Sequence, residues 1–122
     1  MSHEFKGKLV WADFYEVDGK LLNDSKALEQ ICRSAAEYSG MHVHAIKSYV
    51  FEPQGVDVFV SLLESSIVIH TYPEHNSCFV DIFTCGNADP FKILGRMIAT
   101  IKPGGLDFGE INRGENRRRK RR

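Results

Sequence analysis

Hydrophobic and polar residues alternate along much of the chain, which is the pattern of β-strands with two different faces. A first strand is predicted over residues 8–15, which are rich in β-forming side chains and precede the turn signal Asp18-Gly19. Further strands are predicted over residues 42–51, 56–63, 66–72, 78–85 and 105–111. Turn-forming residues separate the four central strands, which are therefore expected to form a meander.

Two segments have helical periodicity instead. After Asn23 or Asp24, either of which can serve as an N-cap, apolar residues recur at positions 28, 31, 32 and 35 until Gly40 supplies a stop. Asp89 and Pro90 begin a second helix, and the turn residues at 103 and 104 end it. The apolar stripe of this second helix consists of Leu94, Met97, Ile98 and Ile101.

The resulting order βαββββαβ predicts an α+β fold, a two-layer α/β sandwich in which both helices cover one face of an antiparallel-rich sheet. The other face would need a cover, which favours a homodimer. The length of 122 residues suits a single domain, expected over residues 1–116. The basic run 117–122 is predicted to be a disordered tail.

Composition limits the partners more than it identifies the function. Without the six basic residues of the tail, ten basic residues remain against sixteen acidic ones, so the body carries a net charge of −6. An acidic body suits a cationic small molecule better than a nucleic acid. The three cysteines, Cys32, Cys78 and Cys85, show no metal-ligand or disulfide spacing, and no apolar run is long enough to span a membrane. A reducing cytoplasm is therefore the expected location.

A metal site is not predicted. His42 and His44 lie on one strand face and His75 in a nearby turn, but no carboxylate or thiol stands at ligand spacing from them.

The candidate chemistry lies in the meander. Ser65 lies in a strand-to-strand turn, His70 follows five residues later, and Cys85 follows after one more hairpin. Taken singly, each is an ordinary structural residue. Because they come from adjacent segments, the three side chains are expected to be able to converge.

Two sequence segments that contain these residues, which we call the motif blocks, carry a more specific signal than the residues taken singly. Residues 64–74 read E-S-S-I-V-I-H-T-Y-P-E and residues 81–86 read D-I-F-T-C-G. They closely resemble the prokaryotic S-adenosylmethionine decarboxylase family, whose signature is E-S-H-x-x-I-H-T-W-P-E followed by D-x-[FY]-T-C-G. The resemblance covers roughly residues 7 to 113.

The resemblance implies a proenzyme that cleaves itself between Glu64 and Ser65. Ser65 would become a pyruvoyl cofactor, leaving a β chain of residues 1–64 and an α chain of residues 65–122. By the same mapping His70 assists processing, and Cys85 returns a proton to the substrate. The implied product feeds spermidine biosynthesis.

The implied substrate-binding residues are Phe51, Tyr72 and Glu74, where Tyr72 replaces the tryptophan of the family. Two further departures are Asp57, where the family has a processing serine, and Ser66, where it has histidine. A carboxylate at position 57 could replace the hydrogen bond of that serine or bind the cationic group of arginine or ornithine, which members of this family also decarboxylate. The departures also leave open an inactive homologue that acts as a binding or regulatory partner.

Overall fold

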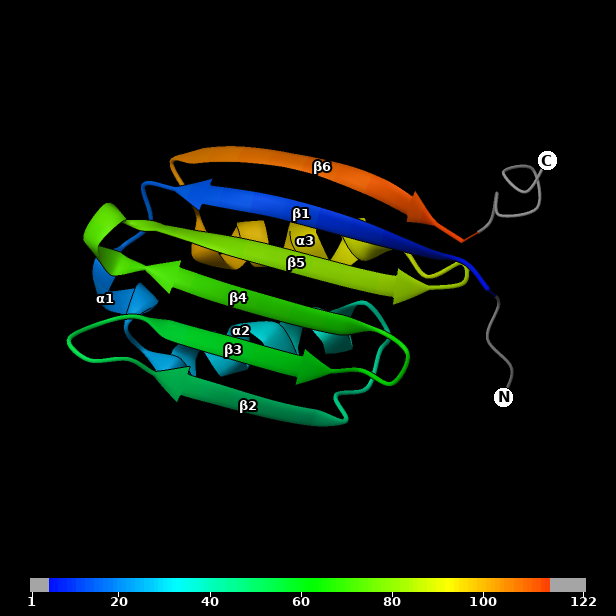
Figure 1. Cartoon of the computed structure of the whole chain (residues 1–122), viewed down its shortest axis with the longest axis horizontal. Coiled ribbons are helices and arrows are strands. Elements are labelled where there is room, and N and C mark those ends of the chain that lie inside the picture. The colour runs from blue at the N-terminus through cyan, green and yellow to red at the C-terminus, as the bar shows by residue number, and fades with distance from the viewer. Residues whose placement is uncertain (1–4, 115–122) are drawn as a thin grey trace.

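The computed structural model describes residues 5–114, which form one six-stranded antiparallel sheet with its helices on one side (Figure 1). The basic tail predicted over residues 117–122 lies outside the described residues. The strands run in the spatial order β2-β3-β4-β5-β1-β6. Their bounds are Gly7–Tyr15 for β1, Ala45–Val50 for β2, Val56–Ser61 for β3, Ser66–Tyr72 for β4, Ser77–Cys85 for β5 and Gly105–Arg113 for β6.

Two long helices cover one sheet face, as predicted. They are α2 (Ser25–Tyr38) and α3 (Pro90–Ile101), each capped by an aspartate whose side chain accepts a backbone N–H of the first turn. Their apolar sides bury alternate residues of the strands, such as Val10, Ile69 and Ile82, in one core. The two-layer α/β sandwich expected from the sequence is therefore confirmed.

Two single-turn elements were not predicted. They are the helix α1 (Gly19–Leu22) and the 3₁₀ turn η1 (Pro73–His75). Both are shorter than the period over which a helical pattern can be recognised. Within residues 5–114, no helix has the length and apolar character needed to cross a lipid bilayer.

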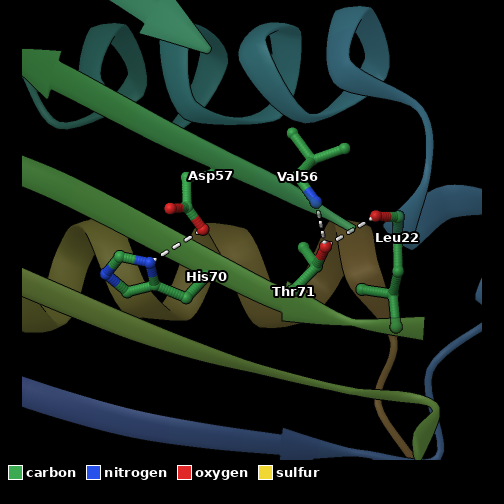
Figure 2. A network of polar contacts seen from close by, with 5 residues as sticks. All are labelled: Leu22, Val56, Asp57, His70 and Thr71. Atoms are coloured by element: carbon green, nitrogen blue, oxygen red, sulfur yellow. Dashed lines mark hydrogen bonds and ion pairs between the residues drawn. The ribbon is translucent and has the colours of Figure 1, made fainter. Parts of the chain in front are cut away.

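A buried threonine ties the end of β4 to its neighbours (Figure 2). The Thr71 hydroxyl accepts the Val56 N–H at 2.8 Å and donates to the Leu22 carbonyl at 2.8 Å. These bonds join α1, the start of β3 and the end of β4. Because neighbouring residues of a strand point to opposite faces, fixing Thr71 on the helix side also fixes His70 on the other side.

The second face of the sheet, which we call the open face, is not covered by any described helix (Figure 1). Register and alternation assign to it large side chains that are 37–50% exposed. An uncovered surface this rich in aromatic residues is typical of a protein interface. These side chains are Trp11, Tyr15, Tyr49, Phe59, Tyr72 and Phe79.

Candidate active site

Ser65 follows a strained turn in the hairpin that joins β3 to β4. Leu63 and Glu64, the two central residues, have φ angles of 57° and 62°. Turns of this kind favour Asn and Gly, because a larger side chain at positive φ crowds the backbone by about 1–2 kcal/mol per residue. The Leu62 N–H donates to the Ser65 carbonyl at 2.8 Å and closes the hairpin. The Glu64–Ser65 peptide bond thus directly follows two left-handed residues.

The end of β5 brings Cys85 beside this hairpin. The Cys85 backbone N–H donates to the Ser65 Oγ at 3.3 Å, and the Cys85 thiol donates to the Glu64 Oε1 at 3.6 Å. Ser65 is only 7% exposed. We call Glu64, Ser65 and Cys85 the serine cluster; it holds one hydroxyl next to the preceding peptide bond and one thiol proton close by.

The three thiols differ in environment, which predicts a difference in reactivity. Burial raises the pKa of Cys32 and of Cys78 to about 12, whereas Cys85 is only half-buried. Because the thiolate is the reactive form, one thiol per chain should react quickly with an aromatic disulfide reagent at neutral pH, and three after unfolding. In the Cys85→Ala variant no thiol of the native protein should react quickly, and fast reaction of even one thiol there would contradict the assignment.

His70 forms a close pair with Asp57 across the β3–β4 ladder. The two residues are register partners, and the His70 Nδ1 lies 2.8 Å from the Asp57 Oδ1 (Figure 2). An ionised carboxylate only accepts hydrogen bonds, so Nδ1 carries the proton and donates it. The Phe59 ring also stands edge-on to the imidazole at 5.9 Å. Asp57 therefore fixes the tautomer of His70 and leaves Nε2 as the basic nitrogen.

Further candidate residues gather at the same end of the sheet. Phe51 directly follows β2 and is 48% exposed, and the Tyr72 ring packs against Phe79 at 5.1 Å between centroids. Glu74 is exposed in η1, just past the end of β4. We call this group the histidine cluster. It consists of Phe51, Asp57, His70, Tyr72 and Glu74.

The serine and histidine clusters lie toward opposite ends of β4. His70 lies five positions after Ser65, which corresponds to about 16 Å along an extended strand. The chain therefore brings Ser65 together with Cys85, but it does not bring His70 to Ser65 as the sequence led us to expect. Both clusters nevertheless meet the open face, because Cys85, Asp57 and His70 all point away from the helices.

A pocket of about 490 Å³ opens beside the serine cluster. Glu64 and Cys85 form part of its wall. The remaining wall includes Phe83, which belongs to the second motif block, and Phe5, Lys6 and Arg113, which lie outside both blocks. Lys6 and Arg113 are far apart in sequence and meet here because β6 pairs with β1.

Comparison with known proteins gives the same family as the sequence motifs. Residues 8–114 match the family model described as S-adenosylmethionine decarboxylase. A relative from Bacillus cereus, named S-adenosylmethionine decarboxylase proenzyme 2, is 37% identical over 93% of this chain and 94% of its own length. A relative from Pyrobaculum arsenaticum, named arginine decarboxylase proenzyme, is 38% identical over 80% of this chain and 76% of its own length.

The fold agrees with that assignment. The crystal structure of the adenosylmethionine decarboxylase from Aquifex aeolicus superimposes with a TM-score of 0.83, at 29% identity, over 91% of this chain and 92% of that one. The match to the family model spans both clusters and every strand except the first residue of β1. The chain therefore belongs to the S-adenosylmethionine decarboxylase family.

Proposed function

We propose that this protein is a proenzyme that cleaves its own chain between Glu64 and Ser65 and so becomes a pyruvoyl-dependent decarboxylase. The observation that carries the proposal is the serine cluster. A buried hydroxyl there follows two left-handed residues and is held by the Cys85 N–H. Backbone strain in the residues next to this peptide bond lowers the free-energy cost of breaking the bond.

The cleavage has two bond-breaking stages. In the first, the Ser65 Oγ attacks the Glu64 carbonyl carbon and the C–N bond breaks. The hydroxyl proton passes to the freed Ser65 nitrogen, and the amide becomes an ester. In the second, a base removes the Ser65 α-proton, and the ester oxygen leaves on Glu64 as a carboxylate. The dehydroalanine left at position 65 takes up water and loses ammonia, which yields the pyruvoyl group. No oxidant or reductant is needed.

His70 is the proposed base for the second stage, with Asp57 as its positioning residue. Asp57 accepts the Nδ1 proton, so the Nε2 lone pair is available for the α-proton. Its carboxylate also stabilises the imidazolium that forms, as in other carboxylate–histidine pairs. This role explains how a carboxylate can stand where the family has a serine.

Asp57→Asn should slow self-cleavage without abolishing it. The amide keeps the shape of the side chain but can present an N–H to Nδ1 and so favour the wrong tautomer of His70. We expect a roughly 10- to 100-fold slower reaction, less than the 10²–10⁴-fold effect of a general base itself. Time courses on denaturing gels measure the rate. Nitrogen NMR of His70 should show the tautomer change, and an unchanged rate and tautomer would contradict this role.

The serine cluster also fits the decarboxylation. A pyruvoyl group at residue 65 would supply an electron-accepting carbonyl. The Cys85 thiol, which donates to Glu64 in the precursor, holds a proton that can be delivered to the substrate α-carbon. Cys85→Ala is therefore expected to cleave but to release little product.

The favoured substrate is S-adenosylmethionine, whose decarboxylated form supplies aminopropyl groups for the synthesis of spermidine. The family assignment and the exposed aromatic rings of the histidine cluster support it, because Phe51 and Tyr72 can stack on an adenine and a sulfonium cation. Glu74 can accept hydrogen bonds from ribose hydroxyls.

Arginine or ornithine is the second candidate. Asp57 presents a carboxylate on the open face, and one relative carries the name arginine decarboxylase proenzyme. Carbon dioxide release from the three substrates should be measured side by side with cleaved protein. Release from S-adenosylmethionine at least ten times faster than from the other two is expected; turnover of arginine or ornithine alone would reject the favoured substrate.

We further propose that the active form is a homodimer joined through the open faces. A two-fold axis near the middle of β4 reverses the strand direction, so it would set the serine cluster of one protomer over the histidine cluster of its partner. The exposed aromatic side chains of the open face would be buried at the same time. The dimer thus supplies the contact between Ser65 and His70 that one chain lacks.

A further inference from the structure

We infer that Lys6 and Arg113 form a carboxylate-binding site that receives the new C-terminus of Glu64 after the chain is cleaved. The inference rests on the proposed self-cleavage and concerns the pocket of about 490 Å³ beside the serine cluster. Glu64, Lys6 and Arg113 share the wall of this pocket with the rings of Phe5 and Phe83.

The strand register brings Arg113 toward Glu64. Gly7 on β1 pairs with Cys85 on one side and with Arg113 on the other. Side chains at paired positions point to the same face, so Arg113 and Cys85 lie on the open face, two strands apart. That spacing is about 10 Å, most of which an extended arginine side chain can span.

The Phe83 ring lies over Gly7, at the position between Arg113 and Cys85. A Cβ at position 7 would lie 2.3 Å from this ring, so glycine at this position leaves room for the ring as part of the pocket wall. Lys6 is held next to the end of β5, because its carbonyl accepts the Gly86 N–H at 3.0 Å. Pairing therefore fixes the backbones of both basic residues at the end of the sheet where cleavage occurs.

Cleavage creates a need for these cations. The peptide bond at Glu64 is neutral, whereas its product is a carboxylate on the same residue that already carries a side-chain carboxylate. Two negative charges beside apolar rings are costly unless cations accompany them. Arginine binds a carboxylate through two parallel N–H donors, so Arg113 suits this group better than water or a lone lysine. The site would hold the cut end of the 1–64 chain away from residue 65.

The test compares Arg113→Gln in two backgrounds, the cleavable chain and the uncleavable Ser65→Ala chain. We expect the substitution to lower the thermal midpoint of the cleaved protein by at least about 3 °C more than that of the intact one, since only the cleaved protein contains the new carboxylate. The effect of Lys6→Gln on the thermal midpoint should depend on cleavage in the same way. Arg113→Lys should lower the midpoint of the cleaved protein less than Arg113→Gln does.

Lys8→Gln is the matched control. Lys8 lies on β1 two residues from Lys6, but it pairs with Glu110 at 3.5 Å and is not part of the pocket wall. The Lys8→Gln substitution should change the thermal midpoint equally in the cleavable and the uncleavable background. If Arg113→Gln also lowers the thermal midpoint equally in both backgrounds, the carboxylate-binding site is overturned while the self-cleavage stands. An unsubstituted chain that stays intact would overturn both the self-cleavage and this site.

A second measurement separates the Glu64 carboxylate from that of the substrate. The ligands are S-adenosylmethionine and its decarboxylated form, or arginine and agmatine if arginine is the substrate turned over. Arg113→Gln should change the affinities of the two members of a pair by the same factor, within about twofold. If Arg113→Gln weakens binding only of the ligand that still carries its carboxylate, the site binds the substrate carboxylate and our inference is overturned.

Discussion

Ser65→Ala should leave a single chain of 122 residues that releases no carbon dioxide from any substrate. The unsubstituted protein should instead separate into chains of 64 and 58 residues on a denaturing gel. The effect is complete because the Ser65 hydroxyl is both the attacking group and the source of the carbonyl at the new N-terminus. Mass spectrometry of the intact and cleaved forms measures the outcome.

Ser66→Ala is the matched control for this experiment. Ser66 is the neighbouring serine and begins β4, where it pairs with Ser61 of β3 and Phe83 of β5. It stands one residue past the strained turn, so its substitution should leave the cleavage site at Glu64–Ser65 unchanged. A chain that still cleaves with alanine at 65 would show that Ser65 is not the nucleophile, and a chain that stops cleaving only with alanine at 66 would assign the attack to Ser66.

If the unsubstituted protein also stays intact during long incubation, the protein is not a self-cleaving proenzyme. The chain would then be an inactive homologue that serves as a binding or regulatory partner. The Asp57–His70 pair bears on this choice, because a carboxylate that orients the histidine keeps a base in place where the family has a serine. This geometry favours an active proenzyme over an inactive one.

Most of the fold was predictable because each strand and long helix leaves a periodic pattern. The alternation along β3 and β4 is visible in the sequence, and in the structure it places Asp57 and His70 on one face of their strands and Val58 and Ile69 on the other. The helix α1 left no such pattern, because it has four residues, and only the capping aspartate marks its start. Short elements depend on tertiary contacts, such as the bond from Thr71 to the Leu22 carbonyl.

The candidate site was predictable in its residues but not in its geometry. The motif blocks identify Ser65, His70 and Cys85, but they do not show how far apart these residues lie on an extended strand. The Asp57–His70 contact depends on the register of β3 against β4, which the loop between them sets. Arg113 joined the site only through the pairing of β6 with β1, a contact between the two ends of the described chain.

Mixing two inactive variants should restore cleavage if Ser65 and His70 act across the proposed dimer. Ser65→Ala lacks the nucleophile and His70→Ala lacks the base, so neither should cleave alone. In a mixed dimer the Ser65 of one protomer faces the partner's His70, and one of the two sites is complete. If the chains combine at random, about half of the His70→Ala chains should be cleaved.

The pair His70→Ala and Asp57→Asn is the matched control for the mixing experiment. Both substitutions lie in the histidine cluster, so a mixed dimer has one site without the histidine and one with a disoriented histidine. Mixing should then give no more cleavage than Asp57→Asn gives alone. If the first pair forms mixed dimers, as light scattering and tagged chains would show, and still does not cleave, Ser65 and His70 cannot act across this interface. In that case the 16 Å that five strand residues span would have to be closed within one chain, by a change in the β3–β4 hairpin.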